Sequence, residues 1–304
     1  MRQINFIKYN KIWVGWTIFI TVSGLILIFV LGLKPGIDFT GGSLFEISFS
    51  QSRPDNNQIN QVLLKNNFKE NTIQKSGEKD VIIRTNFLSE TEHQKILADF
   101  KKEFKKNNNK ITESRFETIG AAVSQQLRSR AVWAVILVVL AIVIYVAYAF
   151  RNVSRPVASW KYGVLAIVAV LHDIVLVLAV FAILGKVSGV EISIAIVVAL
   201  LTILGYSIND TIVVFDRIRE NLLKTRWENF GEVVNNGLNQ TLMRSINTTL
   251  TTLLPLFALY FAGGSTIHYF SLALLIGIAS GAYSSIFIAS PLLVMSEKWK
   301  RQAK

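Results

Sequence analysis

The chain of 304 residues contains no cysteine, only three histidines and only five prolines. Without cysteine it can form neither a disulfide nor a thiolate metal site. The sequence offers no nucleophile–base set and no cluster of metal ligands, so we predict no catalytic residue, no metal, no cofactor and no enzymatic activity. The phosphate-cradling motifs GxxxxGK(S/T) and GxGxxG are missing as well.

Charge is also scarce, because 17% of the residues are charged while 51% are hydrophobic. A helix needs about 20 apolar residues to cross about 30 Å of hydrocarbon. Runs of this kind occupy residues 12–33, 131–150, 162–184, 192–216, 238–262 and 268–295. The sequence therefore predicts a polytopic α-helical membrane protein with six transmembrane helices. The first run is longer than the apolar region of a signal peptide and no cleavage site follows it, so we interpret it as a retained helix.

The net charge of +12 is unevenly distributed along the chain. Basic residues collect in the amino-terminal tail, in 151–161, in 217–237 and in the carboxyl-terminal tail, whereas the two short opposite turns contain only Lys186. The positive-inside rule then predicts cytoplasmic termini and a cytoplasmic loop at 217–237. A basic chain can also bind nucleic acid, but the usual fold signatures are missing, so no nucleic-acid partner is predicted.

This topology places residues 34–130 outside the cytoplasm. Residues 1–33 contain the first transmembrane helix, and residues 131–304 contain the other five. The expected elements of residues 34–130 are strands at 43–50, 72–76, 80–85 and 111–119, and helices at 57–68 and from Ser89, where Glu92 completes a capping box. The order β-α-β-β-α-β is that of a ferredoxin-like α+β domain. His93, alone in the second helix, is expected to be exposed.

The segment GIDFTGG, residues 36–42, follows the first apolar run and Pro35. Gly36, Gly41 and Gly42 permit tight reversal of the chain, so we predict a structural turn from helix to strand. A phosphate-binding loop is the alternative, but no phosphate motif supports it. Asp38 is interpreted as a turn or capping acid.

Asn209 and Asp210 lie inside the fourth apolar run, where an Asp costs about 2.5–3.5 kcal/mol against insertion. Arg244 lies in the fifth run, and both Asp210 and Arg244 are about six residues, or roughly 9 Å, from the inner edge. We expect an ion pair between them that protonation of Asp210 would release. A static structural pair or a hydrogen-bonded polar seam is the alternative.

Asp173 stands near the middle of the third run, where it is either a second proton-carrying site or a packing acid. His172 beside it is expected to be structural. The hydroxyls of the threonine-rich fifth run either bridge helices or line a proton path. Gly277 and Gly281 form a GxxxG motif in the sixth run, which favours close helix contact within the chain or with a partner.

Four motifs together resemble the SecD/SecF family, the accessory of the bacterial Sec translocon, in the resistance–nodulation–division superfamily. They are GIDFTGG, the HD pair at 172–173, GYSINDTIVVFDRIRE across 205–220 and NQTLMRSINTTLTTLLPL across 239–256. The resemblance covers nearly the whole chain and fits the smaller, SecF-type half. It implies a subunit in the bacterial cytoplasmic membrane that uses the proton motive force to help SecYEG move secreted polypeptides.

The same resemblance implies pairing with SecD, whose helices are pseudo-symmetric to these and which supplies a further essential acid. It also implies that Asp210 and Arg244 serve proton passage. Two other functions stay open at this point: a scaffold that only holds the translocon together, and half of another proton-coupled exporter of the superfamily.

Overall fold

The computed structural model describes residues 4–68, 71–105, 109–151, 157–224 and 229–302. It divides into two compact units, one of 1–33, 133–183 and 195–304, and another of 34–132 and 184–194. We call the first the membrane unit and the second the outer unit, after the location that the sequence predicts for it. The outer unit therefore includes, besides the segment after the first apolar run, an 11-residue piece from between the third and fourth runs.

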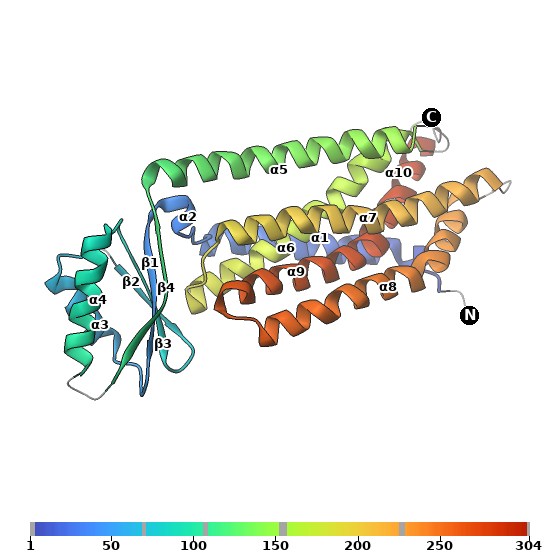
Figure 1. The fold of residues 1–304 in the computed structure, drawn as a ribbon. Helices are drawn as coiled ribbons and strands as arrows, with labels where there is room; N and C mark the ends of the chain where they lie inside the picture. Colours follow the sequence, from blue (N-terminus) through green and yellow to red (C-terminus); the bar gives the residue numbers. More distant parts are fainter. Residues whose placement is uncertain (1–3, 69–70, 106–108, 152–156, 225–228, 303–304) are drawn as a thin grey trace. The chain divides into compact units, whose positions relative to one another are not determined.

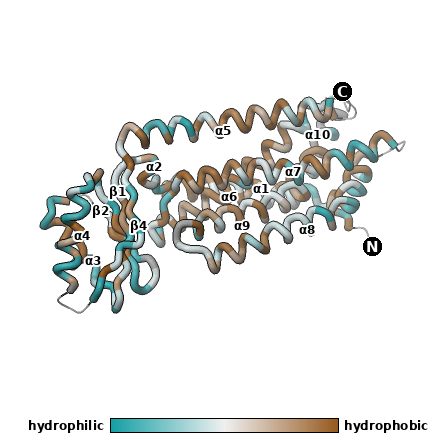
Figure 2. The backbone as a smooth tube through the Cα atoms, in the orientation of Figure 1, coloured by the Kyte–Doolittle hydropathy of each residue, from teal (hydrophilic) through white to brown (hydrophobic). Residues whose placement is uncertain are grey.

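The described residues form six helical stretches long and apolar enough to cross a membrane, which confirms the predicted number. The helices of the first five are α1 (Asn10–Leu31), α5 (Ala121–Ala149), α6 (Ser159–Ser188), α7 (Ile194–Lys224) and α8 (Phe230–Ala262). The sixth combines α9 (Ser265–Ser284), a π-helical turn (Ser285–Ala289) and α10 (Ser290–Gln302). Figure 2 shows long hydrophobic stretches along α5, α6 and α7.

The π-helical turn precedes Pro291, which has no N–H to donate to the preceding turn. Within the same turn, the hydroxyl of Ser290 donates to the carbonyl oxygen of Ser285 at 3.0 Å. The sixth span thus stays continuous while its hydrogen-bonding pattern widens for one turn.

The predicted loop at 217–237 is wrong in most of its length, because α7 continues to Lys224 and α8 begins at Phe230. Both extensions are amphipathic. Ile218 and Leu222 on α7, and Val233 and Val234 on α8, are buried in the core of the membrane unit. The loop was predicted from the charged residues of the segment, but its apolar residues have the spacing of one helix face.

The outer unit has a four-stranded antiparallel sheet in the order β2-β3-β1-β4, where β1 is Gly42–Phe49, β2 Asn71–Ser76, β3 Asp80–Thr85 and β4 Ile111–Ile119. Helices α3 (Asn56–Lys65) and α4 (Glu90–Lys105) lie on one face of it (Figure 1). Their apolar faces meet the sheet in a core that includes Phe45, Ile47, Ile59, Leu63 and Phe100. Element order and strand order agree with the predicted ferredoxin-like domain.

His93 is buried, with 4% of its surface exposed, so its predicted exposure is wrong. Its Nε2 lies 2.5 Å from the Oε1 atom of Glu113, and its ring stacks on Phe116 with centroids 3.6 Å apart. The spacing of His93 from Ile96 and Phe100 places it on the apolar face of α4. The apolar periodicity of α4 therefore predicts the burial of His93 better than the polarity of its imidazole does.

Candidate functional site

Asp173 lies at the junction of α6, α7 and α9, with none of its surface exposed. Its Oδ2 accepts hydrogen bonds from Ser207 of α7 at 2.6 Å and from Ser284 of α9 at 2.8 Å. Its Oδ1 accepts one from Ser280 of α9 at 2.5 Å. The carboxylate is acceptor-only, and the three hydroxyls supply the donors that a buried acid requires. Asp173 therefore ties three membrane helices together.

The GxxxG glycines bring α9 close enough to α7 for this junction to form. A Cβ added to Gly277 would lie 2.2 Å from the Cδ1 atom of Ile203, and one added to Gly281 would lie 3.0 Å from the Cβ atom of Ser207. Larger residues at either position would push α9 away from the helix that carries Ser207. The motif packs within the chain, one of the two uses that the sequence left open.

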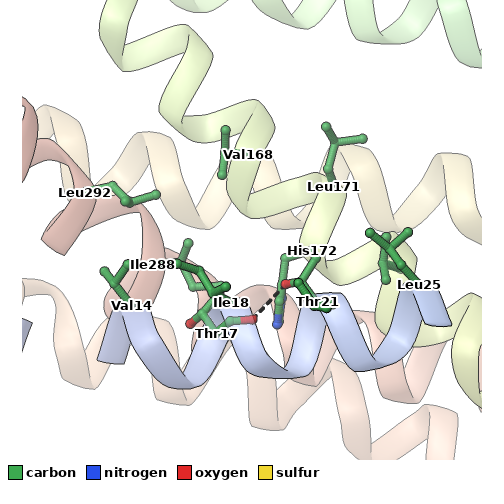
Figure 3. Close-up of a pocket in the computed structure, with 12 residues that line it drawn as sticks. Val14, Thr17, Ile18, Thr21, Leu25, Val168, Leu171, His172, Ile288 and Leu292 are labelled. Atoms are coloured by element: carbon green, nitrogen blue, oxygen red, sulfur yellow. Dashed lines mark hydrogen bonds between the residues drawn. The ribbon is translucent and has the colours of Figure 1, made fainter. Parts of the chain in front are cut away.

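His172 connects this junction to a groove of about 670 Å³ on the membrane unit (Figure 3). Its Nδ1 lies 3.2 Å from the Oδ1 atom of Asp173, whereas its Nε2 is buried without a partner among the described groups. Apolar side chains of α1, α6, the π-helical turn and α10 form most of the groove wall. Thr21, also in the wall, donates its hydroxyl to the carbonyl of Thr17. This wall is suited to an apolar neighbour and offers few hydrogen bonds.

Two polar contacts set the register of α7 against α8. The hydroxyl of Tyr206 donates to the carbonyl oxygen of Thr248 at 3.0 Å, and the Nε atom of Arg217 donates to the Oε1 atom of Gln240 at 2.7 Å. Asp210 lies between these points on α7, and Arg244 lies between them on α8. The two residues are therefore at matching depth, as the residue count from the inner edge predicts.

Matching depth does not produce the predicted ion pair, which is absent at the 4 Å limit within the described chain. Asp210 is buried, with 4% of its surface exposed, and its Oδ2 has no hydrogen-bond partner among the described residues. Arg244 is exposed and acts on Asp210 only as a more distant charge. The expectation of direct contact was wrong.

The angular position of Arg244 on α8 explains the missing contact. Thr241, Ser245 and Thr249 recur every four residues and are buried, so they define the inward face of the helix. Arg244 is one residue, or about 100°, away from that face. Depth can be counted from the sequence, but the rotation of the helix about its axis is set by packing.

The threonine-rich stretch of α8 contains two kinds of hydroxyl. Thr248 and Thr251 are exposed, and each donates to a backbone carbonyl of its own helix. Ser245 and Thr249 are buried, and their hydroxyl oxygens lack partners among the described groups. The same is true of the Oδ2 atom of Asp210. Sequence reasoning singled out the stretch but could not separate its two faces. Asn209, beside Asp210, is exposed.

The GIDFTGG residues fold as the predicted turn, with a one-turn helix inside it, α2 (Ile37–Thr40). Gly41 and Gly42 have φ of +75° and +117°, and a Cβ on Gly42 would lie 2.6 Å from the carbonyl oxygen of Thr85. Gly36 donates its N–H to the carbonyl of Ile192 at 2.8 Å. Asp38 accepts the first N–H of α7, from Ile194, at 2.7 Å, which is the geometry of a capping acid.

Comparison with known proteins places these elements in one family. Residues 99–299 match the family described as protein export membrane protein SecD/SecF, C-terminal, and residues 26–52 match the SecD/SecF GG motif. The chain is 41% identical to the protein translocase subunit SecF of Thermobaculum terrenum over 97% of this chain and 94% of that one. It is 33% identical to the SecF subunit of Anaerolinea thermophila over 99% and 97%.

A solved structure gives the same result at the level of the fold. The crystal structure of SecDF from Thermus thermophilus superposes with a TM-score of 0.84 at 35% identity, over 98% of this chain and 39% of that one. The present chain thus corresponds to less than half of that longer protein. The six spans, the GG turn, the sheet order and these matches establish that the chain belongs to the SecD/SecF family of protein translocase subunits, on its SecF side.

Proposed function

We propose that this chain is the SecF-type half of a SecD–SecF complex that uses the proton motive force to assist SecYEG in exporting polypeptides across the bacterial cytoplasmic membrane. Asp210 is the proposed proton-carrying group. The observation that carries this assignment is its burial within α7 with one carboxylate oxygen unpartnered among the described residues. A buried acid with an open acceptor position can exchange a proton or a partner.

The exposure of Arg244 supports the proposal that SecD covers part of the surface formed by α7 and α8. Polar side chains are exposed on α7 and α8 within the candidate spans, at Asn209, Arg244, Asn247, Thr248 and Thr251. Polar groups of membrane helices usually face protein or water rather than lipid. A second six-helix subunit that brings an acid to Arg244 would satisfy this face, and proton passage would then run between the two subunits.

Asp173 takes the other role that the sequence left open, that of an acid holding helices together. Its carboxylate oxygens are already supplied by three serines, so it has little need of an outside partner. The proposed orientation keeps both termini and the 217–237 segment in the cytoplasm and exposes the outer unit to the exported chain.

Export by the reconstituted complex tests the role of Asp210. Vesicles would contain SecYEG with its motor and the SecD–SecF complex, with and without a proton gradient. Asp210→Asn should remove the part of export that the gradient stimulates, because an amide cannot carry the proton. Asp216→Asn, the same change at an exposed position of α7, is the matched control.

An alternative outcome would favour a scaffold role. If Asp210→Asn retained full gradient-dependent export and bound SecD normally, the proton role would be refuted and the chain would act by holding the translocon together.

A further inference from the structure

The turn between α6 and α7, residues 189–193, joins the helix that carries Asp173 to the helix that carries Asp210. It nevertheless belongs to the outer unit, together with the flanking helix ends. A rigid helix transmits a shift along its axis, so a rearrangement of α6 against α7 must reach this turn. The contacts of the turn therefore decide whether the outer unit responds.

Backbone hydrogen bonds hold the turn to the segment that follows α1. Ile192 donates its N–H to the carbonyl of Lys34 at 2.7 Å, and its own carbonyl accepts the N–H of Gly36. With Pro35 opposite Ile192, the two segments form a short parallel bridge. The carboxylate of Asp38 adds the cap on the first N–H of α7.

Side chains hold the same turn to the β2–β3 hairpin. The Nε atom of Arg84 on β3 lies 2.8 Å from the Oε2 atom of Glu191, and both side chains are largely buried, at 13% and 17% exposure. The Nη1 atom of Arg84 also donates to the Oε1 atom of Gln74 on β2, at 2.9 Å. Gln74 in turn donates to the carbonyl of Ser188, the last residue of α6, at 2.7 Å.

Burial makes this ion pair sensitive to loss of either partner. Desolvation raises the pKa of Glu191, and the charges of Arg84 and Lys34 oppose that shift. Desolvation likewise lowers the pKa of Arg84, against the attraction of Glu191. Asp38 and Arg115 are the other charges that act on the pair. A largely buried charge left without its partner is strongly unfavourable.

The pair also has space beside it. A polar hollow of about 390 Å³ is bounded by Arg84, Glu191 and the hydroxyl or amide side chains of the GG turn and of β2 and β3. Water or a displaced side chain can enter a hollow of this kind, so the pair can separate without unfolding the sheet.

We infer that Arg84 and Glu191 are positioning residues for energy coupling, forming the joint through which the α6–α7 turn moves the outer unit. This inference rests on the proposed proton-driven function. It adds that the outer unit is driven through this joint by the two helices that carry the membrane acids.

The test measures proton movement and export separately in vesicles containing the full SecD–SecF complex and SecYEG. Glu191→Gln and Arg84→Gln should each retain proton movement but lose gradient-stimulated export. The double exchange Arg84→Glu with Glu191→Arg should restore a substantial part of export, which a general loss of stability would not allow. Lys65→Gln, which removes an exposed ion pair between α3 and α4, should leave both readouts unchanged.

The results separate the joint from the function on which it rests. Wild-type complex without gradient-stimulated export would refute the proposed function itself. Normal export in both single variants would overturn the joint while leaving the proton role intact. A double exchange no better than the single variants would also overturn it, because the effect would then not depend on the pairing of charges.

Discussion

Asp173 and Asp210 are both buried acids in membrane helices, but their surroundings differ. Asp173 is met by three serine hydroxyls from two other helices, whereas Asp210 retains an oxygen without a partner among the described groups. An acid whose acceptor positions are filled holds one arrangement, and an acid with an open position can change its proton or partner. Hydrogen-bond saturation, and not burial, therefore separates the packing acid from the candidate proton carrier.

The largest effect on stability is expected from Asp173→Ala. The change removes the acceptor of Ser207 and Ser280, and it leaves Ser284 only its bond to the carbonyl of Gly281. A buried hydroxyl left unsatisfied costs about 1–3 kcal/mol. We expect the purified complex to lose about 3 kcal/mol of unfolding free energy. Denaturant unfolding in detergent would measure it, and an unchanged midpoint would contradict the packing role.

A smaller loss is expected from Gly277→Ala, which tests the close approach that surrounds Asp173. The new methyl group would overlap the side chain of Ile203, and such overpacking costs about 1–3 kcal/mol. Gly205→Ala is the matched control on α7, because nothing lies within 4 Å of its added Cβ. Equal stability of the two variants would show that α9 does not depend on this contact.

The smallest change in stability is expected from Asp210→Asn, although it should abolish proton-dependent export. Its Oδ2 has no described partner to lose, so the loss of unfolding free energy should be smaller than that of Asp173→Ala or Gly277→Ala. The same unfolding assay would measure it. A loss as large as that of Asp173→Ala would erase the contrast and assign both acids to packing.

Local patterns in the sequence predicted much of the architecture. Apolar runs of sufficient length identified six spans, and alternation with helical spacing identified the order of the outer elements. The glycines of the GG turn followed from local conformational requirements. These features depend on neighbours in the chain, so one sequence contains them.

Features that depend on rotation about a helix axis were predicted less well. Arg244 has the expected depth but not the expected direction, and His93 lies on the buried face of α4 although it is polar. The segment 217–237 was predicted as a loop from its charged residues, although it also contains a buried apolar stripe at Ile218, Leu222 and Val233.

Local patterns in the chain were enough to predict the class of the molecule, its six spans, its ferredoxin-like domain and the residues that are costly to bury. The three-dimensional packing gives those residues their partners: serines from α7 and α9 for Asp173, Arg84 for Glu191, and no described residue for the Oδ2 atom of Asp210. The physical reason is that the free energy of inserting a residue depends on its own chemistry and depth, whereas a hydrogen bond or ion pair requires two atoms from distant segments to lie within about 3 Å.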